Sequence, residues 1–300
     1  MKLNVQLNVQ QLLRKVRGKR GAPSSAKKEV ESILEERRNL LSPKSDFFVR
    51  EAYKTLRTNV SFSLTGEEKC PVIVVTSSMQ GEGKSITAMN LAISYALTDR
   101  KVLVIDCDLR RPKLARLMRV SAKAGLSNLI LNPKLLEDAI VPTHVEGLDV
   151  ILAGDIPPNP SELLGSERMG RIVAALREKY DFIILDSPPV NMVTDAVVLA
   201  PRSDGVLFLV RANHSERGAV IHAVEQLEYA KVKILGFVLN GVDMENTHYG
   251  YGSRRYKKYG RYRRYGYGGY GYGYGYGYGY SSSARPTAEQ VLDELREADA

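Results

Sequence analysis

Four near-continuous apolar runs rich in β-branched residues constrain the fold of this 300-residue chain more than any other feature. They are PVIVVT from Pro71, KVLVID from Lys101, DFIILDS from Asp181 and GVLFLV from Gly205. Strands of this composition are buried on both faces, as in parallel sheets. The segments LDVILA and ILGFVLN are two further strand candidates. The chain is therefore expected to form a mostly parallel sheet.

Helical patterns separate several of these runs. They are KSITAMNLAISYAL, RMGRIVAALREKY and ERGAVIHAVEQLEYA, and residues 46–63 show a further helical pattern. An alternation of strands and helices indicates βαβ units with right-handed crossovers. We predict an α/β fold with a doubly wound, mostly parallel sheet over about residues 46–248.

The stretch TSSMQGEGKS joins the first run to a helix and has the context of a phosphate loop. Gly81 and Gly83 would let backbone N–H groups face phosphate oxygens at the positive end of the helix dipole. Lys84 would reach the β- and γ-phosphates, and Ser85 would offer its hydroxyl to Mg²⁺. The usual loop begins with glycine where this chain has Ser78, so a glycine-rich turn without a ligand is the alternative.

Three aspartates stand at the ends of predicted strands. Asp106 and Asp108 are two residues apart and project to the same side of a strand, and Asp186 ends another strand. Ligands of doubly wound sheets gather beyond the carboxyl ends of the strands. A single aspartate at such a place is more often a helix cap or turn residue. Three of them after a phosphate loop favour a Mg²⁺–nucleotide site.

The net charge of +9 is concentrated at the ends of the chain. Residues 1–28 hold eight Lys and Arg, residues 249–280 hold seven, and neither segment has an acid. The other twenty-eight basic residues face thirty-four acidic ones, so the body is mildly acidic and no nucleic-acid partner is expected. The chain has only two cysteines, which predicts a reducing cytoplasm. It has no long apolar run and no signal-peptide core, so no membrane span is expected.

Residues 249–283 form a low-complexity tail. Thirteen of the seventeen tyrosines lie between Tyr249 and Tyr280, many of them alternating with glycine. Glycine increases the entropy lost on ordering, so we expect a disordered tail. The tail would be either a substrate for phosphorylation or, as the alternative, a segment that promotes association by stacking of its tyrosines. Residues 284–300 predict an acidic helix, and residues 1–41 predict a basic arm with a short helix.

Together these motifs resemble the bacterial tyrosine kinases that regulate capsule and exopolysaccharide synthesis, a P-loop fold of the deviant-Walker ATPase type. The resemblance covers about residues 42–280. It depends on QGEGKS, VLVIDCDLRRP, FIILDSPP, NPSELL from Asn159 and the tyrosine cluster. Related division and partition ATPases carry an additional lysine early in the loop, which residues 77–83 lack. Iron–sulfur carriers need paired cysteines, which are absent too. The expected kinase domain spans residues 42–248.

The resemblance implies ATP and Mg²⁺ as cofactors and a role for each site residue. Lys84 would hold the phosphates, Asp186 would orient metal-bound water, Asp108 would support the metal, and Asp106 would orient or deprotonate the attacking tyrosine. An unperturbed phenol has a pKa of about 10 and is mostly protonated at neutral pH, so a neighbouring carboxylate could accept its proton. The implied metal residues are Ser85, Asp108 and Asp186. The implied nucleotide-binding residues are Gly81, Glu82, Gly83, Lys84, Ser85, Ile86 and Asn240. The implied autophosphorylation sites are Tyr256, Tyr259, Tyr262, Tyr265, Tyr267, Tyr270, Tyr272, Tyr274, Tyr276, Tyr278 and Tyr280.

The stretch EAYKTLR resembles the family's Glu-x-x-Arg-x-x-Arg oligomer motif, with Glu51 and Arg57 in place and Lys54 where arginine is expected. A homo-oligomeric ring is therefore implied, and a solvated helix face is the alternative. The resemblance also implies a transmembrane activating adaptor similar to a polysaccharide co-polymerase and a cognate tyrosine phosphatase. The chain is expected in the cytoplasm, recruited to the inner face of the membrane. A nucleotide-switched assembly ATPase that uses the tail for interactions is the competing hypothesis.

Overall fold

The structure, a computed structural model, describes residues 36–64 and 69–242. Four predictions concern residues outside this part of the chain: most of the N-terminal arm, the disordered tail, the acidic C-terminal helix and all eleven candidate autophosphorylation sites.

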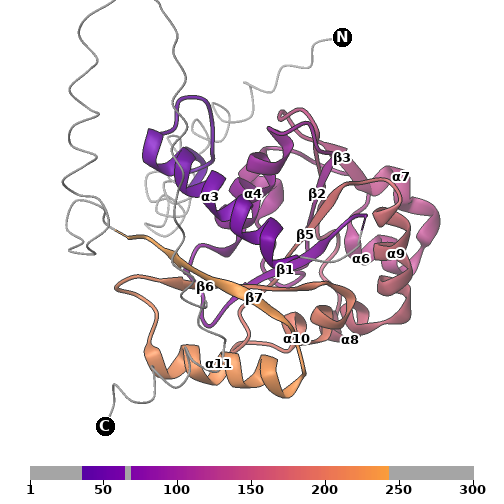
Figure 1. Ribbon diagram of the computed structural model, residues 1–300. Helices are drawn as coiled ribbons and strands as arrows, with labels where there is room; N and C mark the ends of the chain where they lie inside the picture. The colour runs from indigo at the N-terminus through magenta and orange to yellow at the C-terminus, as the bar shows by residue number, and fades with distance from the viewer. Residues whose placement is uncertain (1–35, 65–68, 243–300) are drawn as a thin grey trace, which may run out of the picture. The chain divides into compact units, whose positions relative to one another are not determined.

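A seven-stranded sheet forms the centre of the described chain (Figure 1). Its strands are β1 (Val72–Ser77), β2 (Val102–Asp106), β3 (Ile140–Pro142), β4 (Leu148–Ile151), β5 (Phe182–Asp186), β6 (Gly205–Arg211) and β7 (Ile234–Asn240). Their order is β3-β4-β2-β5-β1-β6-β7, and every neighbouring pair is parallel except β3 with β4. The predicted parallel sheet is confirmed. The sequence patterns missed β3, because a three-residue edge strand is too short to show a periodicity.

The four helical patterns predicted for this part of the chain correspond to α3, α4, α9 and α11, to within three residues at each end, whereas the five shorter helices were not predicted. The helices are α3 (Phe47–Ser63), α4 (Lys84–Ala96), α5 (Leu114–Met118), α6 (Leu126–Leu131), α7 (Leu136–Ala139), α8 (Pro160–Gly165), α9 (Glu167–Arg177), α10 (Asp195–Leu199) and α11 (Arg217–Tyr229), with 3₁₀ turns at Pro133–Leu135 and Ala200–Arg202. Among the described residues, no helix is both long and apolar enough to cross a bilayer.

The central strands are buried on both faces, as their composition predicts. All residues of β1, β2 and β5 are buried. Ile73 and Val75 belong to the core cluster shared with α4, and the alternating residues Val72 and Val74 face the other way. Figure 1 shows α3 and α4 over one face of the sheet and α10 and α11 over the other. This two-sided cover is that of a doubly wound sheet.

The strand order determines where the functional groups meet. β5 lies between β1 and β2, although some 75 residues separate β2 from β5 in the chain. The carboxyl ends of β1, β2 and β5 therefore lie side by side. The phosphate loop follows β1, and the predicted aspartates stand at the ends of β2 and β5.

Candidate functional site

The phosphate loop connects β1 to α4 through two left-handed glycines. Gly81 has a φ of 82°, and Gly83, which caps the N-terminus of α4, has a φ of 95°. A Cβ atom at Gly83 would lie 2.2 Å from Nδ2 of Asn240, so a side chain here would displace the Asn240 amide from the loop. Glycine is required here by both the backbone conformation and the close approach. The loop keeps the open backbone that a phosphate-binding turn needs.

Glu82 stabilises this loop from inside. Its carboxylate is buried and accepts hydrogen bonds from the Ser78 hydroxyl at 2.8 Å and the Met79 backbone N–H at 2.8 Å. A third hydrogen bond comes from the Ser215 hydroxyl. Burial raises the pKa of Glu82, but these hydrogen bonds outweigh it, so the pKa lies below its usual value. Among the predicted nucleotide-binding residues, Glu82 therefore uses its side chain to hold the shape of the loop.

The connection between β6 and α11 packs against the outside of the loop. Arg211 Nη1 donates to the Gly81 carbonyl at 2.6 Å, and His214 Nε2 lies 3.1 Å from the Gln80 carbonyl oxygen. We call Arg211, His214 and Ser215 the clasp. Sequence reasoning missed these residues, because they lie some 130 positions from the loop and match no local motif.

Two further predicted nucleotide-binding residues lie next to the loop or follow it. Asn240, at the end of β7, donates through Nδ2 to the Glu82 carbonyl at 2.9 Å. Ile86, in the first turn of α4, packs its side chain against the hydrophobic core. Asn240 thus contacts the loop, whereas the partly buried side chain of Ile86 packs on the core, and a nucleotide-binding role for either residue stays a prediction.

Asp106 and Asp186 are direct neighbours, because β2 and β5 pair in parallel with these residues in register. Both are 1% exposed, and both Asp186 oxygens and Oδ1 of Asp106 lack a partner with normal hydrogen-bond geometry. Burial raises the pKa of Asp186 to about 6, although the Ser85 hydroxyl and the Lys84 ammonium both act to lower it. Burial and the Asp186 charge raise the pKa of Asp106 well above its usual value.

Asp106 also has a structural contact. Its Oδ2 accepts from the backbone N–H groups of Lys113 and Leu114, each at 3.0 Å, at the start of α5. One carboxylate oxygen is therefore held in place while Oδ1 is left for another partner. The raised pKa and the open oxygen make Asp106 a candidate proton acceptor.

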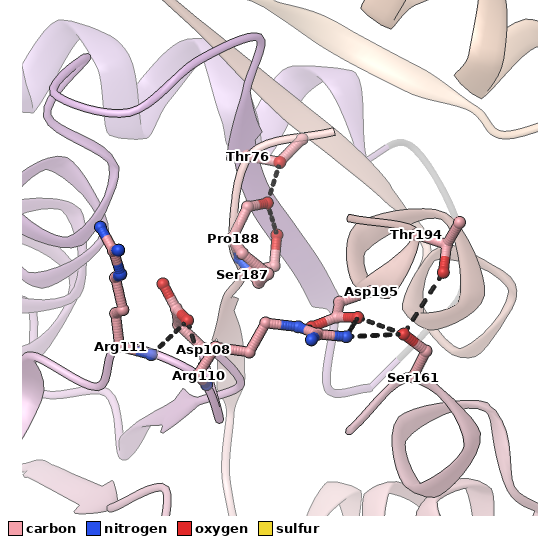
Figure 2. A network of polar contacts seen from close by, with 9 residues as sticks. All are labelled: Thr76, Asp108, Arg110, Arg111, Ser161, Ser187, Pro188, Thr194 and Asp195. Carbon is pink, nitrogen blue, oxygen red and sulfur yellow. Dashed lines mark hydrogen bonds and ion pairs between the residues drawn. The ribbon is translucent and has the colours of Figure 1, made fainter. Parts of the chain in front are cut away.

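Asp108 belongs to the loop after β2 and is half-buried. Its Oδ1 accepts from the backbone N–H groups of Arg111 at 2.9 Å and Arg110 at 3.3 Å (Figure 2). Lys84 faces the same group of acids: burial lowers its pKa, and Asp186 and Asp108 oppose that shift. The predicted lysine and three aspartates therefore meet at one place.

The donor set suits Mg²⁺ that is held together with a nucleotide. Within residues 36–64 and 69–242, no three acidic, His or Cys side chains form a ready-made metal cage. Mg²⁺ is usually bound by one or two carboxylates together with substrate phosphates and water. The unpartnered oxygens of Asp186 beside the Ser85 hydroxyl supply such oxygen ligands. The residues present fit a Mg²⁺ ion that depends on phosphate oxygens for the rest of its shell.

A phosphate loop after β1 and acidic strand ends on β2 and β5 define a P-loop nucleotide-binding protein. In agreement, a family model described as an AAA domain matches residues 70–235. The chain belongs to the bacterial tyrosine-protein kinase family, as its relatives show. It is 38% identical over 211 residues to the putative tyrosine-protein kinase CapB of Staphylococcus aureus, covering 70% of this chain and 91% of CapB. It is 36% identical over 202 residues to the tyrosine-protein kinase YwqD of Bacillus subtilis, covering 67% and 85%.

A solved structure supports the same assignment. The kinase domain of the Escherichia coli tyrosine kinase ETK superposes with a TM-score of 0.63 at 36% identity, covering 68% of this chain and 80% of that domain. The P-loop fold and the family expected from the motifs are thereby confirmed. The roles of the individual site residues stay predictions.

Proposed function

We propose that this protein is an ATP-dependent protein-tyrosine kinase that phosphorylates its own C-terminal tyrosine cluster. The observation that carries the proposal is the meeting of Lys84 with the carboxylates of Asp106, Asp108 and Asp186 beside a phosphate loop. The family membership agrees with it.

In the proposed reaction, the tyrosine Oη forms a bond to the γ-phosphorus while the bond from that phosphorus to the ADP oxygen breaks. The phenolic proton passes to Oδ1 of Asp106, the oxygen without a partner. Lys84 holds the β- and γ-phosphates, and the N–H groups of the phosphate loop surround them. Mg²⁺, when bound, supplies positive charge for the phosphate oxygens, and Ser85, Asp108 and Asp186 would hold it.

The tail suits a substrate that reaches a neighbouring subunit. A flexible chain the length of residues 249–280 has a root-mean-square reach of about 30 Å and a full extension of about 100 Å. Each phosphate adds about −1.5 to −2 charges, so four or five phosphates would neutralise the seven basic residues of this segment. Reaction in trans within an oligomer, followed by weaker association of the modified tails, is the regulation we propose.

The pathway and partners follow from the family resemblance. We propose control of capsular or exopolysaccharide synthesis and export, activation by a transmembrane adaptor and reversal by a cognate tyrosine phosphatase. The adaptor would recruit the chain from the cytoplasm to the inner face of the membrane.

A nucleotide-switched assembly ATPase is the second candidate, because related ATPases share this arrangement of sheet and acids. The two functions differ in the fate of the γ-phosphate. The ATPase releases it to water, whereas the kinase leaves it on tyrosine.

The test is to incubate the full chain with Mg·ATP, with and without the cytoplasmic segment of a candidate adaptor. Phosphotyrosine is then mapped by mass spectrometry, and assembly is followed by sedimentation. We expect phosphotyrosine between Tyr256 and Tyr280, more of it with the adaptor, and none in Lys84→Met. ATP hydrolysis without phosphotyrosine in the tail would favour the assembly ATPase.

A further inference from the structure

A fully buried carboxylate lies beside the site without belonging to the predicted machinery. Asp195 begins α10 and is 0% exposed. It forms a two-pronged ion pair with Arg110, with Nε 3.1 Å from Oδ2 and Nη2 3.3 Å from Oδ1. The Ser161 hydroxyl donates a further hydrogen bond to Oδ1 (Figure 2). A forked pair of this kind fixes the orientation of the guanidinium as well as its distance.

The cluster of Arg110, Ser161 and Asp195 joins three segments that are distant in sequence. Arg110 lies in the loop after β2, Ser161 lies in α8, and Asp195 follows β5. Arg110 Nη2 and the Thr194 hydroxyl each lie 3.3 Å from the Ser161 hydroxyl. Ser161 comes from the NPSELL motif, which has no role in the reaction proposed above. Through these contacts the serine of that motif is held next to the loop after β2.

The same arginine holds Asp108 through its backbone. The N–H groups of Arg110 and Arg111 both donate to Oδ1 of Asp108, and residues 107–113 contain no helix or strand. The side chain of Arg111 continues to Gln80 in the phosphate loop, with Nη1 3.2 Å from Oε1. The backbone that holds the Asp108 carboxylate is thus anchored by two side chains, that of Arg110 on Asp195 and that of Arg111 on Gln80.

We propose that Asp195 and Ser161 are positioning residues that orient Asp108 for Mg²⁺ through Arg110. The proposal rests on the role proposed above for Asp108. Neither Asp195 nor Ser161 touches the metal or the nucleotide in this scheme. Residues that orient a metal ligand typically change metal affinity by about 10- to 100-fold when they are replaced.

The experiment measures Mg²⁺ binding directly, by calorimetric titration of Mg²⁺ into the full chain saturated with ADP. We expect Asp195→Asn to weaken Mg²⁺ binding by about 10- to 100-fold, and Ser161→Ala and Arg110→Lys to weaken it less. ADP affinity without Mg²⁺ should stay within about twofold of wild type for all three, because Lys84 and the phosphate loop are unchanged.

The matched control is Asp204→Asn. Asp204 forms a similar ion pair with Arg177 at 3.0 Å, at the amino end of the sheet beside Val72. This variant should lower the melting temperature and leave Mg²⁺ binding unchanged. If Asp195→Asn does not fold, Ser161→Ala and Arg110→Lys decide the outcome.

The Asp108→Asn variant separates the two proposals. If it binds Mg²⁺ as wild type does, the metal role of Asp108 fails, whatever Asp195 does. If Asp108→Asn weakens Mg²⁺ binding while the Asp195, Ser161 and Arg110 variants do not, the positioning role fails. If these variants lose Mg²⁺ binding and Mg²⁺-free ADP binding equally, the cause is general damage to the fold, and the positioning role also fails.

Discussion

At the residue scale, the site is built from charges that the fold holds in unfavourable surroundings. Asp106 and Asp186 lie in register on neighbouring buried strands, and three of their four oxygens lack a partner with normal hydrogen-bond geometry. Ionising a buried carboxyl group beside another acid is unfavourable, so their pKa values rise. The two buried carboxylates therefore destabilise the ligand-free protein, and a ligand that brings positive charge would reduce this cost.

The variant Asp186→Asn should therefore stabilise the nucleotide-free protein at neutral pH while abolishing activity. The native pKa of Asp186 is raised to about 6, so between about pH 4 and pH 6 the folded chain keeps a proton that the unfolded chain has lost. Stability then falls as the pH rises through this range. A shift of about two units corresponds to roughly 2–3 kcal/mol, or a melting temperature about 4–8 °C higher in the variant at pH 7.5.

Scanning calorimetry between pH 4 and 7.5 tests this, without Mg²⁺ or nucleotide. Asp181→Asn, which changes an exposed carboxylate at the other end of β5, is the control and should keep the wild-type pH slope. An Asp186→Asn variant that is less stable than wild type at pH 7.5 would contradict the expectation.

At the scale of secondary-structure elements, the connection from β6 to α11 sets the form of the phosphate loop. The Ser215 hydroxyl accepts from the Arg211 N–H at 2.7 Å and donates to the buried Glu82 carboxylate. Arg211 and His214 contact the loop carbonyls on the same side. The loop is thus held in its open form before any phosphate arrives, which lowers the entropy lost on binding.

Replacing Ser215 with alanine should loosen the loop. The variant removes a hydrogen bond to a buried charged acceptor, which is worth about 1.5–3 kcal/mol of stability. ADP affinity, measured by calorimetry, should fall by about 3- to 10-fold.

Ser203→Ala is a suitable control, because the Ser203 hydroxyl donates to the Ala200 carbonyl at 2.8 Å in the turn before β6, at the amino end of the strand, whereas the loop follows the carboxyl end of β1. Its ADP affinity should equal that of wild type. If Ser215→Ala binds ADP as tightly as Ser203→Ala does, the clasp does not shape the site.

At the scale of the whole molecule, α3 carries the residues that resemble an oligomer motif. Lys54 and Glu51 pair at 2.7 Å on its exposed surface. Arg57, in contrast, donates to the Ser94 carbonyl and lies 3.4 Å from the Ser94 hydroxyl, so it helps to hold α3 on α4. Ring assembly stays a prediction, and Arg57 has a role within the subunit besides any role between subunits.

Lys54 is the position at which to test assembly, because its side chain is 58% exposed and a change there leaves the subunit intact. Lys54→Arg restores the planar, two-pronged donor that the family motif has. We expect the association constant from sedimentation equilibrium to rise about fivefold, with the melting temperature unchanged.

Lys44→Arg, a change at an exposed position just before α3, should leave the association constant unchanged. An association constant for Lys54→Arg that matches that of Lys44→Arg would argue against the motif as an assembly surface. Arg57→Ala should lower the melting temperature whether or not the chain assembles.

Short-range patterns in the sequence predicted the phosphate loop, the place of the three aspartates and every strand except β3. The β-branched runs around Val74 and Ile184 can be buried only inside a sheet covered on both sides, and Gly83 permits a conformation that other residues avoid. These signals are local, so they are visible in a few neighbouring residues. The family resemblance depends on the same short segments.

Only the tertiary structure decided which distant residues serve that site. Ser215 lies 133 positions from Glu82, and Asp195 lies 85 positions from Arg110. No periodicity or spacing connects such pairs, because they are brought together by the order of the strands: β6 lies beside β1, and β5 lies between β1 and β2. The sequence by itself predicted the chemical groups of the candidate site, and the order of the strands decided which distant side chains hold those groups in place.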